Sequence, residues 1–291
     1  MANPICLSPL KFYDSINKQC HRKSYAYNHI SSLVTPVQFI PSFQFVIPDS
    51  LYQVGNSLNY AYLHNAKTDV VVSGNIASEL IEAGFSIQDF EGYKVAIYFG
   101  LLPIQFYKEG EFYLELASTD NNWRYFSEIF CFTNSLDKYL KIEYWNKTGN
   151  FYVKNGIIVF PDNFHFKLLL DTELGKPEYN FEEEGTKRLG YNFIESQVSK
   201  KVYKFNALEP EFICDAMRII RLCSDKIVRT KDDVYDVIAF EMEADWQTQG
   251  DLASVTCEFE TDNVIINLAG FSPELRGGDF NSDYNIDFSI Q

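Results

Sequence analysis

Hydrophobic and polar residues alternate in short runs along the first half of the chain, and turn-forming residues separate the runs. Because successive side chains of a β-strand point to opposite faces of a sheet, this alternation predicts strands rather than helices. Residues 37–40 and 43–47 are predicted to be edge strands or extended segments, because prolines flank them. The other predicted strands cover residues 58–63, 69–72, 95–99, 104–107, 112–116 and 125–132. Strands at this spacing, with no long helix between them, are typical of a β-sandwich.

The second half of the chain continues in the same way. Its predicted strands cover residues 139–145, 151–153, 156–160, 164–170, 227–229 and 234–238. Alternating hydrophobic positions predict one further half-buried strand; they are Ala253, Val255, Cys257 and Phe259. The acidic stretch 182–184, followed by Gly185, predicts an exposed surface loop.

Two segments have the spacing of helices instead. In the longer one, hydrophobic residues recur on one helical face; they are Ile213, Ala216, Met217 and Ile220. Glu209, Pro210 and Glu211 suit the first turn, where a proline and negative charges are favoured, so a helix is predicted over residues 209–223. A shorter helix is predicted over residues 76–83, with Asn75 as N-cap and Gly84 after its end.

The pattern is therefore that of a mainly β protein with two β-sandwich or β-sheet modules, the second carrying one packed α-helix. We place the boundary near residues 133–135. An N-terminal β-sandwich-like domain is predicted for residues 1–134, and a β-rich domain with helix 209–223 for residues 135–276. Residues 277–291 are predicted to form an extended C-terminal arm.

Gly277 and Gly278 precede the C-terminal arm, in which hydrophobic residues alternate with polar ones. The hydrophobic positions are Phe280, Tyr284, Ile286, Phe288 and Ile290. Because a single isolated strand is not stable in water, we expect the arm to pair with a sheet edge. The diglycine favours an edge on a neighbouring molecule, so these five residues are the predicted interaction site.

Net charge and composition exclude several classes of partner. The chain carries a formal charge of −15 at pH 7, which disfavours binding to nucleic acids and to anionic membranes. The one compact basic cluster is at residues 21–23. No apolar run approaches the length of a membrane span, and no signal peptide is visible, so we expect synthesis in the cytoplasm. The six cysteines lack the spacing of a zinc site, in keeping with reduced thiols.

Motifs for catalysis are missing from the sequence. Neither a phosphate-binding glycine loop nor a zinc-protease or serine-hydrolase motif occurs, and the four histidines are dispersed. Residues 279–283 begin like a calcium-binding loop, but Tyr284 and Ile290 stand where that loop requires glycine and glutamate. With 40 acidic residues, no particular carboxylate pair can be selected. The sequence therefore predicts no catalytic residue, no cofactor and no metal site, and we expect a protein that is not an enzyme.

Several segments between residue 136 and about residue 268 carry a family resemblance: LKIEYW (140–145), TELGKPEY (172–179), FEEEG (181–185), YKF (203–205), the predicted helix 209–223 and DWQTQGDLA (245–253). These segments resemble structural proteins of tailed bacteriophages of Bacteroidetes, the crAss-like phages included. Residues 127–131 and the tail from residue 277 to 290 are similar as well. The family comprises distal-tail, baseplate and tail-ring proteins, and its shared motifs are of the packing type.

The resemblance implies a structural virion protein of a phage tail that assembles into an oligomeric ring with copies of itself and with other tail proteins. Closed rings of identical subunits need heterologous interfaces, for which aromatic residues and strand edges are suitable. A carbohydrate-binding β-sandwich module is the alternative, because exposed aromatic rings stack on sugars. A glycosidase with a carboxylate pair is a weaker alternative.

Overall fold

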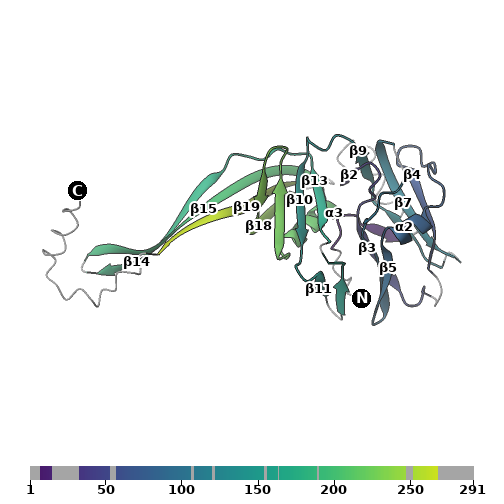
Figure 1. Cartoon of the computed structure of the whole chain (residues 1–291), viewed down its shortest axis with the longest axis horizontal. Helices are drawn as coiled ribbons and strands as arrows, with labels where there is room; N and C mark the ends of the chain where they lie inside the picture. Colours follow the sequence, from purple (N-terminus) through teal and green to yellow (C-terminus); the bar gives the residue numbers. More distant parts are fainter. Residues whose placement is uncertain are drawn as a thin grey trace.

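The computed structural model describes residues 7–14, 33–52, 57–105, 108–119, 122–153, 156–162, 164–188, 190–246 and 252–267. The protein is mainly β, as the sequence predicts, with several sheets and two helices in this part of the chain. Figure 1 shows a body of packed sheets from which one long ribbon of strands extends. The predicted C-terminal arm lies outside the described residues.

Two sheets form the first part of the body. The six-stranded sheet contains β1 (Phe12–Asp14), β8 (Arg124–Ser127), β7 (Gly110–Ser118), β9 (Phe130–Thr133) and β2 (Leu33–Pro36) in that order, with β4 (Leu58–Asn65) also paired to β7. The three-stranded sheet contains β3 (Phe43–Pro48), β6 (Tyr93–Tyr98) and β5 (Phe85–Phe90). Aromatic side chains join the two sheets: the rings of Phe45 and Tyr125 lie 4.7 Å apart, and Tyr125 donates a hydrogen bond to the Val46 carbonyl.

The short helix α2 (Ala77–Glu82) confirms the helix predicted in this half. Asn75 Oδ1 accepts hydrogen bonds from the backbone N–H groups of Ala61 and Ala77, and thereby fixes the start of the helix against β4. Gly84 follows the helix with φ +106°, a conformation that favours glycine, and a Cβ there would lie 2.9 Å from the Phe99 ring. The structure places the helix N-cap at Ile76, one residue after the predicted Asn75.

The second part of the body is built on a four-stranded antiparallel sheet and a hairpin. The sheet contains β13 (Phe166–Leu170), β10 (Leu140–Trp145), β16 (Asp225–Arg229) and β17 (Val234–Asp236), and the hairpin pairs β11 (Asn150–Val153) with β12 (Gly156–Val159). Leu140, Ile142 and Tyr144 are buried, together with their partners on β13. The buried hydrophobic residues of both parts of the body form one continuous core.

The longest strands belong to a second four-stranded sheet. Its order is β14 (Glu178–Arg188), β15 (Tyr191–Pro210), β19 (Leu252–Asn267) and β18 (Ala239–Trp246), and all its neighbours are antiparallel. One end of this sheet lies in the body, where helix α3 (Glu211–Ile220) contacts β15, β18 and β19. The other end extends away from the body as a twisted ribbon, which Figure 1 shows.

Helix α3 corresponds to the predicted helix 209–223 but begins later. Pro210 is the last residue of β15 and pairs with Leu252, so the helix starts at Glu211. Glu209 is consequently a buried strand residue instead of a first-turn carboxylate. Seven of the ten helical residues are buried, which shows that other elements cover the helix on more than one side.

Several predicted strands and one predicted loop are wrong. Residues 182–184 belong to β14, because β15 supplies hydrogen-bonding partners for these charged residues. Residues 37–40 form a turn, and residues 69–72 form an exposed loop held by a single bridge between His64 and Val71. Ile104 and Gln105 are not in a strand, while residues 106 and 107 lie outside the described part. No helix in the described residues has the length and apolar character required to cross a bilayer.

Candidate assembly surface

The part of the second sheet that leaves the body is termed here the β-ribbon and comprises residues 178–188, 191–202 and 260–267. In the body, Phe205 and Phe259 are buried on the face that α3 covers. Because side chains two residues apart on a strand share a face, this face continues along β15 to Lys201 and Ser199. Lys201 pairs with Tyr179, and Ser199 pairs with Phe181.

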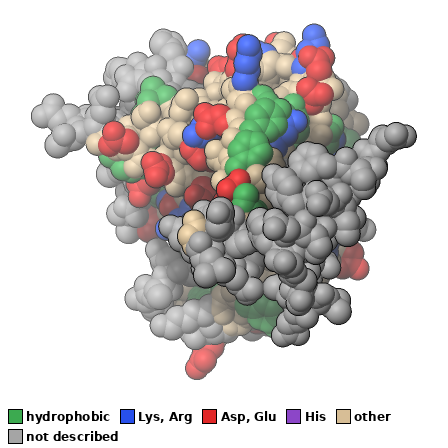
Figure 2. Space-filling model, turned by 90° about the vertical axis from the view of Figure 1, so that its left-hand side faces the viewer, with side chains coloured by type: hydrophobic (Ala, Val, Ile, Leu, Met, Phe, Trp, Pro, Cys, Tyr) green, Lys and Arg blue, Asp and Glu red, His purple; other side chains and the backbone are tan. Residues whose placement is uncertain are grey.

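Tyr179 and Phe181 therefore extend the buried face of the sheet beyond the helix that covers it. Their exposed fractions are 60% and 65%, and every residue of β14 from Glu178 to Gly185 is exposed. Figure 2 views the molecule from the side of the ribbon and shows hydrophobic side chains between acidic and basic ones. Exposed aromatic residues in such a setting are typical of surfaces that contact another molecule.

Both edges of the β-ribbon are open among the described strands. β14 has a neighbour only on its β15 side. Residues 261–267 of β19 likewise have a neighbour only on their β15 side, since β18 ends where Ala239 pairs with Glu260. Backbone N–H and C=O groups along such edges are templates for pairing with a further strand.

Charged side chains hold the ribbon strands to one another on the opposite face. Lys200 Nζ lies 2.7 Å from Glu182 Oε1, and Lys204 Nζ lies 3.0 Å from Glu178 Oε2 and 2.9 Å from Glu258 Oε1. Exposed ion pairs of this kind each stabilise a fold by about 0–1 kcal/mol. Ordering one residue costs about 1–2 kcal/mol in backbone entropy, so the side-chain contacts of the ribbon are a weak source of stability.

A cleft of about 470 Å³ lies between the two parts of the body. Its polar side is a face of the sheet formed by β10 and β13, where the pairs Lys141–Leu169 and Glu143–Lys167 place four side chains together. Its apolar side comes from β2 and from two segments at residues 39–42 and 99–101. Trp145, next to the cleft, stacks on the cleft residue His165 at a ring distance of 3.8 Å.

Glu143 is buried at the polar side of this cleft and lies near three basic side chains. Lys141 Nζ lies 2.6 Å from its carboxylate, Arg229 Nε 3.6 Å and His165 Nδ1 3.7 Å. Burial acts to raise the pKa of Glu143, but the hydrogen bond from Lys141 and the nearby positive charges outweigh burial, so the pKa is lowered. Glu143 is therefore ionised and is neutralised by its neighbours.

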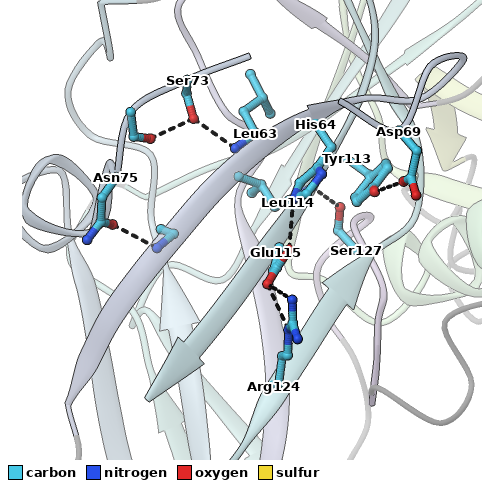
Figure 3. A network of polar contacts seen from close by, with 12 residues as sticks. Leu63, His64, Asp69, Ser73, Asn75, Tyr113, Leu114, Glu115, Arg124 and Ser127 are labelled. Atoms are coloured by element: carbon cyan, nitrogen blue, oxygen red, sulfur yellow. Dashed lines mark hydrogen bonds and ion pairs between the residues drawn. The ribbon is translucent and has the colours of Figure 1, made fainter. Parts of the chain in front are cut away.

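A second buried polar network lies in the first part of the body, and Figure 3 shows it. His64 Nε2 on β4 lies 2.8 Å from Glu115 Oε2 on β7, and Arg124 on β8 donates to the other carboxylate oxygen, with Nε 2.7 Å away. Tyr113 stacks on His64 and donates a hydrogen bond to Asp69. Burial acts to raise the pKa of Glu115, but the hydrogen bonds from His64 and Arg124 lower it overall. The network connects three neighbouring strands and has the character of a structural element.

Glu209 and the buried cysteines lie in the body, on or next to α3 and the strands that it contacts. Burial raises the pKa of Cys214 and Cys223 to about 12 and also raises the pKa of Cys257, so these free thiols are poor nucleophiles. Burial, and to a smaller extent the charge of Asp171, raises the pKa of Glu209 to about 8. These groups are packed into the core beside α3.

The structure places few of the residues that the sequence singles out. The five hydrophobic residues of the C-terminal arm, the basic cluster 21–23, His29, Cys6 and Cys20 lie outside the described residues. His64 and His165 are far apart in the fold, one in the buried network and one at the cleft. Within the described residues, His, Cys, Asp and Glu side chains do not gather in groups of three or more that could hold a metal ion.

Tyr179 and Phe181 are candidate assembly residues that the sequence analysis did not identify, because a charged stretch beside them predicted a loop. Their alternation with polar residues is the signal that identifies a strand there. No protein-family model matches the sequence, and no curated protein matches it.

Proposed function

We propose that this protein is a structural component of a phage tail that assembles with copies of itself and with other tail proteins. The observation that carries the proposal is the β-ribbon, which leaves the body with two open edges and with Tyr179 and Phe181 exposed. The resemblance of the segments between residues 136 and 268 to tail proteins is the reason for proposing a phage tail as the assembly.

The energetics of the β-ribbon support a role in assembly. Its side-chain contacts include exposed ion pairs and exposed hydrogen bonds, and no second layer in the described structure covers Tyr179 and Phe181. Burying an aromatic side chain of this size against a neighbour stabilises a complex by about 1.5–3 kcal/mol. A strand added to either edge would also satisfy backbone groups that have no partner among the described strands. A partner that supplies both contacts is the simplest reason for such an extension.

The properties of the body are consistent with a protein that is not an enzyme. The cleft is lined by a single carboxylate, Glu143, whereas most glycosidases use a pair of carboxylates. Glu143 is held by cations, and the lowered pKa makes it a poor proton donor. The high negative charge of the chain suits a subunit that stays soluble before assembly.

A carbohydrate-binding module is the second candidate, because Tyr179 and Phe181 also form a small exposed aromatic platform. The two candidates differ in oligomeric state and in ligand. A sugar-binding module binds glycans on an array as a monomer and loses binding in Phe181→Ser. A tail protein gives no glycan signal and self-associates.

Mass spectrometry of purified particles of the phage that encodes this chain tests the tail proposal. We expect the chain to be present in multiple copies per particle, at a constant ratio to the other tail proteins. A chain that is abundant in the infected cell but absent from purified particles would contradict the proposal.

A further inference from the structure

The cleft between the two parts of the body has the properties of a docking site for an extended segment. Two edge strands line it. Among the described strands, β2 is the last strand of the six-stranded sheet, and β13 is the edge strand of the sheet that contains β10. Three large hydrophobic side chains at the cleft are exposed to solvent: Phe39 by 38%, Leu101 by 53% and Leu136 by 36%. Its volume of about 470 Å³ is within the range of ligand pockets, about 300–1,000 Å³.

The charge of the cleft differs from that of the chain as a whole. Lys141 and Lys167 line it, and Arg229 stands beside Glu143, so three cations face one carboxylate. The chain as a whole is strongly acidic, with a net charge of −15. A ligand for this cleft should therefore be acidic and should also carry large hydrophobic groups.

The chain itself contains a segment of this chemistry. Residues 279–290 alternate aspartates with hydrophobic residues. The aspartates are Asp279, Asp283 and Asp287, and the hydrophobic residues are Phe280, Tyr284, Ile286, Phe288 and Ile290. The segment contains no basic residue. In an extended conformation its hydrophobic and acidic side chains point to opposite sides, as a cleft with one apolar and one cationic wall requires.

We propose that the cleft receives segment 279–290 of a second copy of this chain, an inference that rests on the proposed assembly function. The direction of β19 favours a second copy over the same chain. β19 begins beside Pro210 in the body and ends at Asn267, opposite Ser196 on the β-ribbon, so the chain leaves the described structure heading away from the cleft. The segment then links neighbouring subunits.

Binding of a synthetic peptide tests the recognition step. The probe is a fluorescent peptide of residues 277–291, and the receptor is the full chain carrying Phe280→Ser, Tyr284→Ser and Phe288→Ser, so that its own segment does not compete. We expect saturable binding that weakens as salt is added, and at least tenfold weaker binding when the receptor also carries Lys167→Gln and Leu101→Gln. Both of these side chains are exposed, so the fold tolerates their replacement. Lys147→Gln is the matched control, because Lys147 is exposed and does not line the cleft.

A peptide that fails to bind, or that binds equally well to the Lys167→Gln, Leu101→Gln receptor, would overturn the proposal. A peptide with the same residues in scrambled order measures unspecific attraction, and equal binding of the two peptides would also overturn it.

A second readout separates the neighbouring copy from the same chain. Excess peptide added to the unaltered full chain should lower the mass of its oligomers, measured by sedimentation velocity. Peptide binding without any change in oligomer mass would show that each chain fills its own cleft, which contradicts the second-copy proposal. A full chain that is monomeric before peptide is added would contradict the proposed assembly function itself, whereas oligomers that ignore the peptide would leave that function intact.

Discussion

Tyr203 on β15 and Phe259 on β19 lie directly opposite each other, with ring centroids 5.5 Å apart and ring planes 18° from parallel. Both side chains are buried, whereas Tyr179, farther along the same face, is exposed. The pair therefore marks the place where the sheet passes from the core into the β-ribbon. The packed core of the body ends at this pair, and the exposed side chains of the β-ribbon begin beyond it.

Replacing Phe259 by alanine should destabilise the body strongly. The side chain is 1% exposed and contacts Tyr203, Phe205 and Tyr235, so its removal leaves a cavity beside the sheet. We expect the free energy of unfolding to fall by about 3–5 kcal/mol in chemical denaturation. Tyr152→Ala, at a residue 78% exposed, is the control and should change stability by less than about 0.5 kcal/mol. Equal effects of the two substitutions would show that the sheet is not packed as described.

Glu209 should make stability depend on pH near neutrality. Its pKa is raised to about 8 in the folded protein, against 4.5 as the ordinary value, so the folded state binds more protons between these values. Stability should therefore decrease as pH rises from about 4.5 to about 8, by an amount on the order of a few kcal/mol, and then level off. Denaturation across this range should show the decrease in the unaltered chain and a flatter profile in Glu209→Gln.

Glu211→Gln is the matched control for this experiment, because Glu211 is exposed at the start of α3. Its profile should follow that of the unaltered chain. If Glu209→Gln follows it too, the carboxyl group of Glu209 is not buried in the folded state.

The network of His64, Glu115 and Arg124 should make stability increase with pH, which is the opposite of the effect of Glu209. The pKa of Glu115 is lowered, so its contribution is complete above its unfolded pKa and is lost as the pH falls through the folded value. Glu115→Gln leaves two donors without their anion and should cost about 1–3 kcal/mol at pH 7. The difference in the free energy of unfolding between this variant and the unaltered chain should become smaller in acid. A difference that becomes larger in acid would show that the folded protein does not stabilise Glu115 as an anion. Glu111→Gln, which breaks only the exposed pair with Lys67, should have little effect.

The sequence predicted several strands that have a buried face, such as β19, but it missed others that also have one, such as β2 and β5, and it missed the exposed strand β14. Alternation at Ala253, Val255, Cys257 and Phe259 identifies β19 because one side of that strand lies against the core. Residues 182–184 carry no such signal, since both faces of β14 are exposed and its stability comes from pairing with β15. Hydrogen bonding between distant strands leaves no trace in the hydrophobic pattern of one strand.

Helix α3 and the cleft show two further limits of the sequence. Glu209 and Pro210 fit a helix start by residue type, yet pairing of Pro210 with Leu252 assigns them to a strand. The cleft joins residues from β2 and β13, which are more than a hundred positions apart in the sequence. Local spacing cannot reveal a site of this kind, because only the packing of the two parts of the body creates it.

The mass of the purified chain in solution, compared with that of a ribbon variant, tests the assembly claim most directly. Tyr179→Ser with Phe181→Ser removes the exposed aromatic residues, and Tyr152→Ser removes a still more exposed ring from the β11 hairpin as a control. Mass photometry over a series of concentrations should show a defined oligomer for the unaltered chain and the control, and a shift towards monomer for the ribbon variant. A single monomer peak for all three proteins, or one unchanged oligomer for all three, would contradict assembly through the β-ribbon.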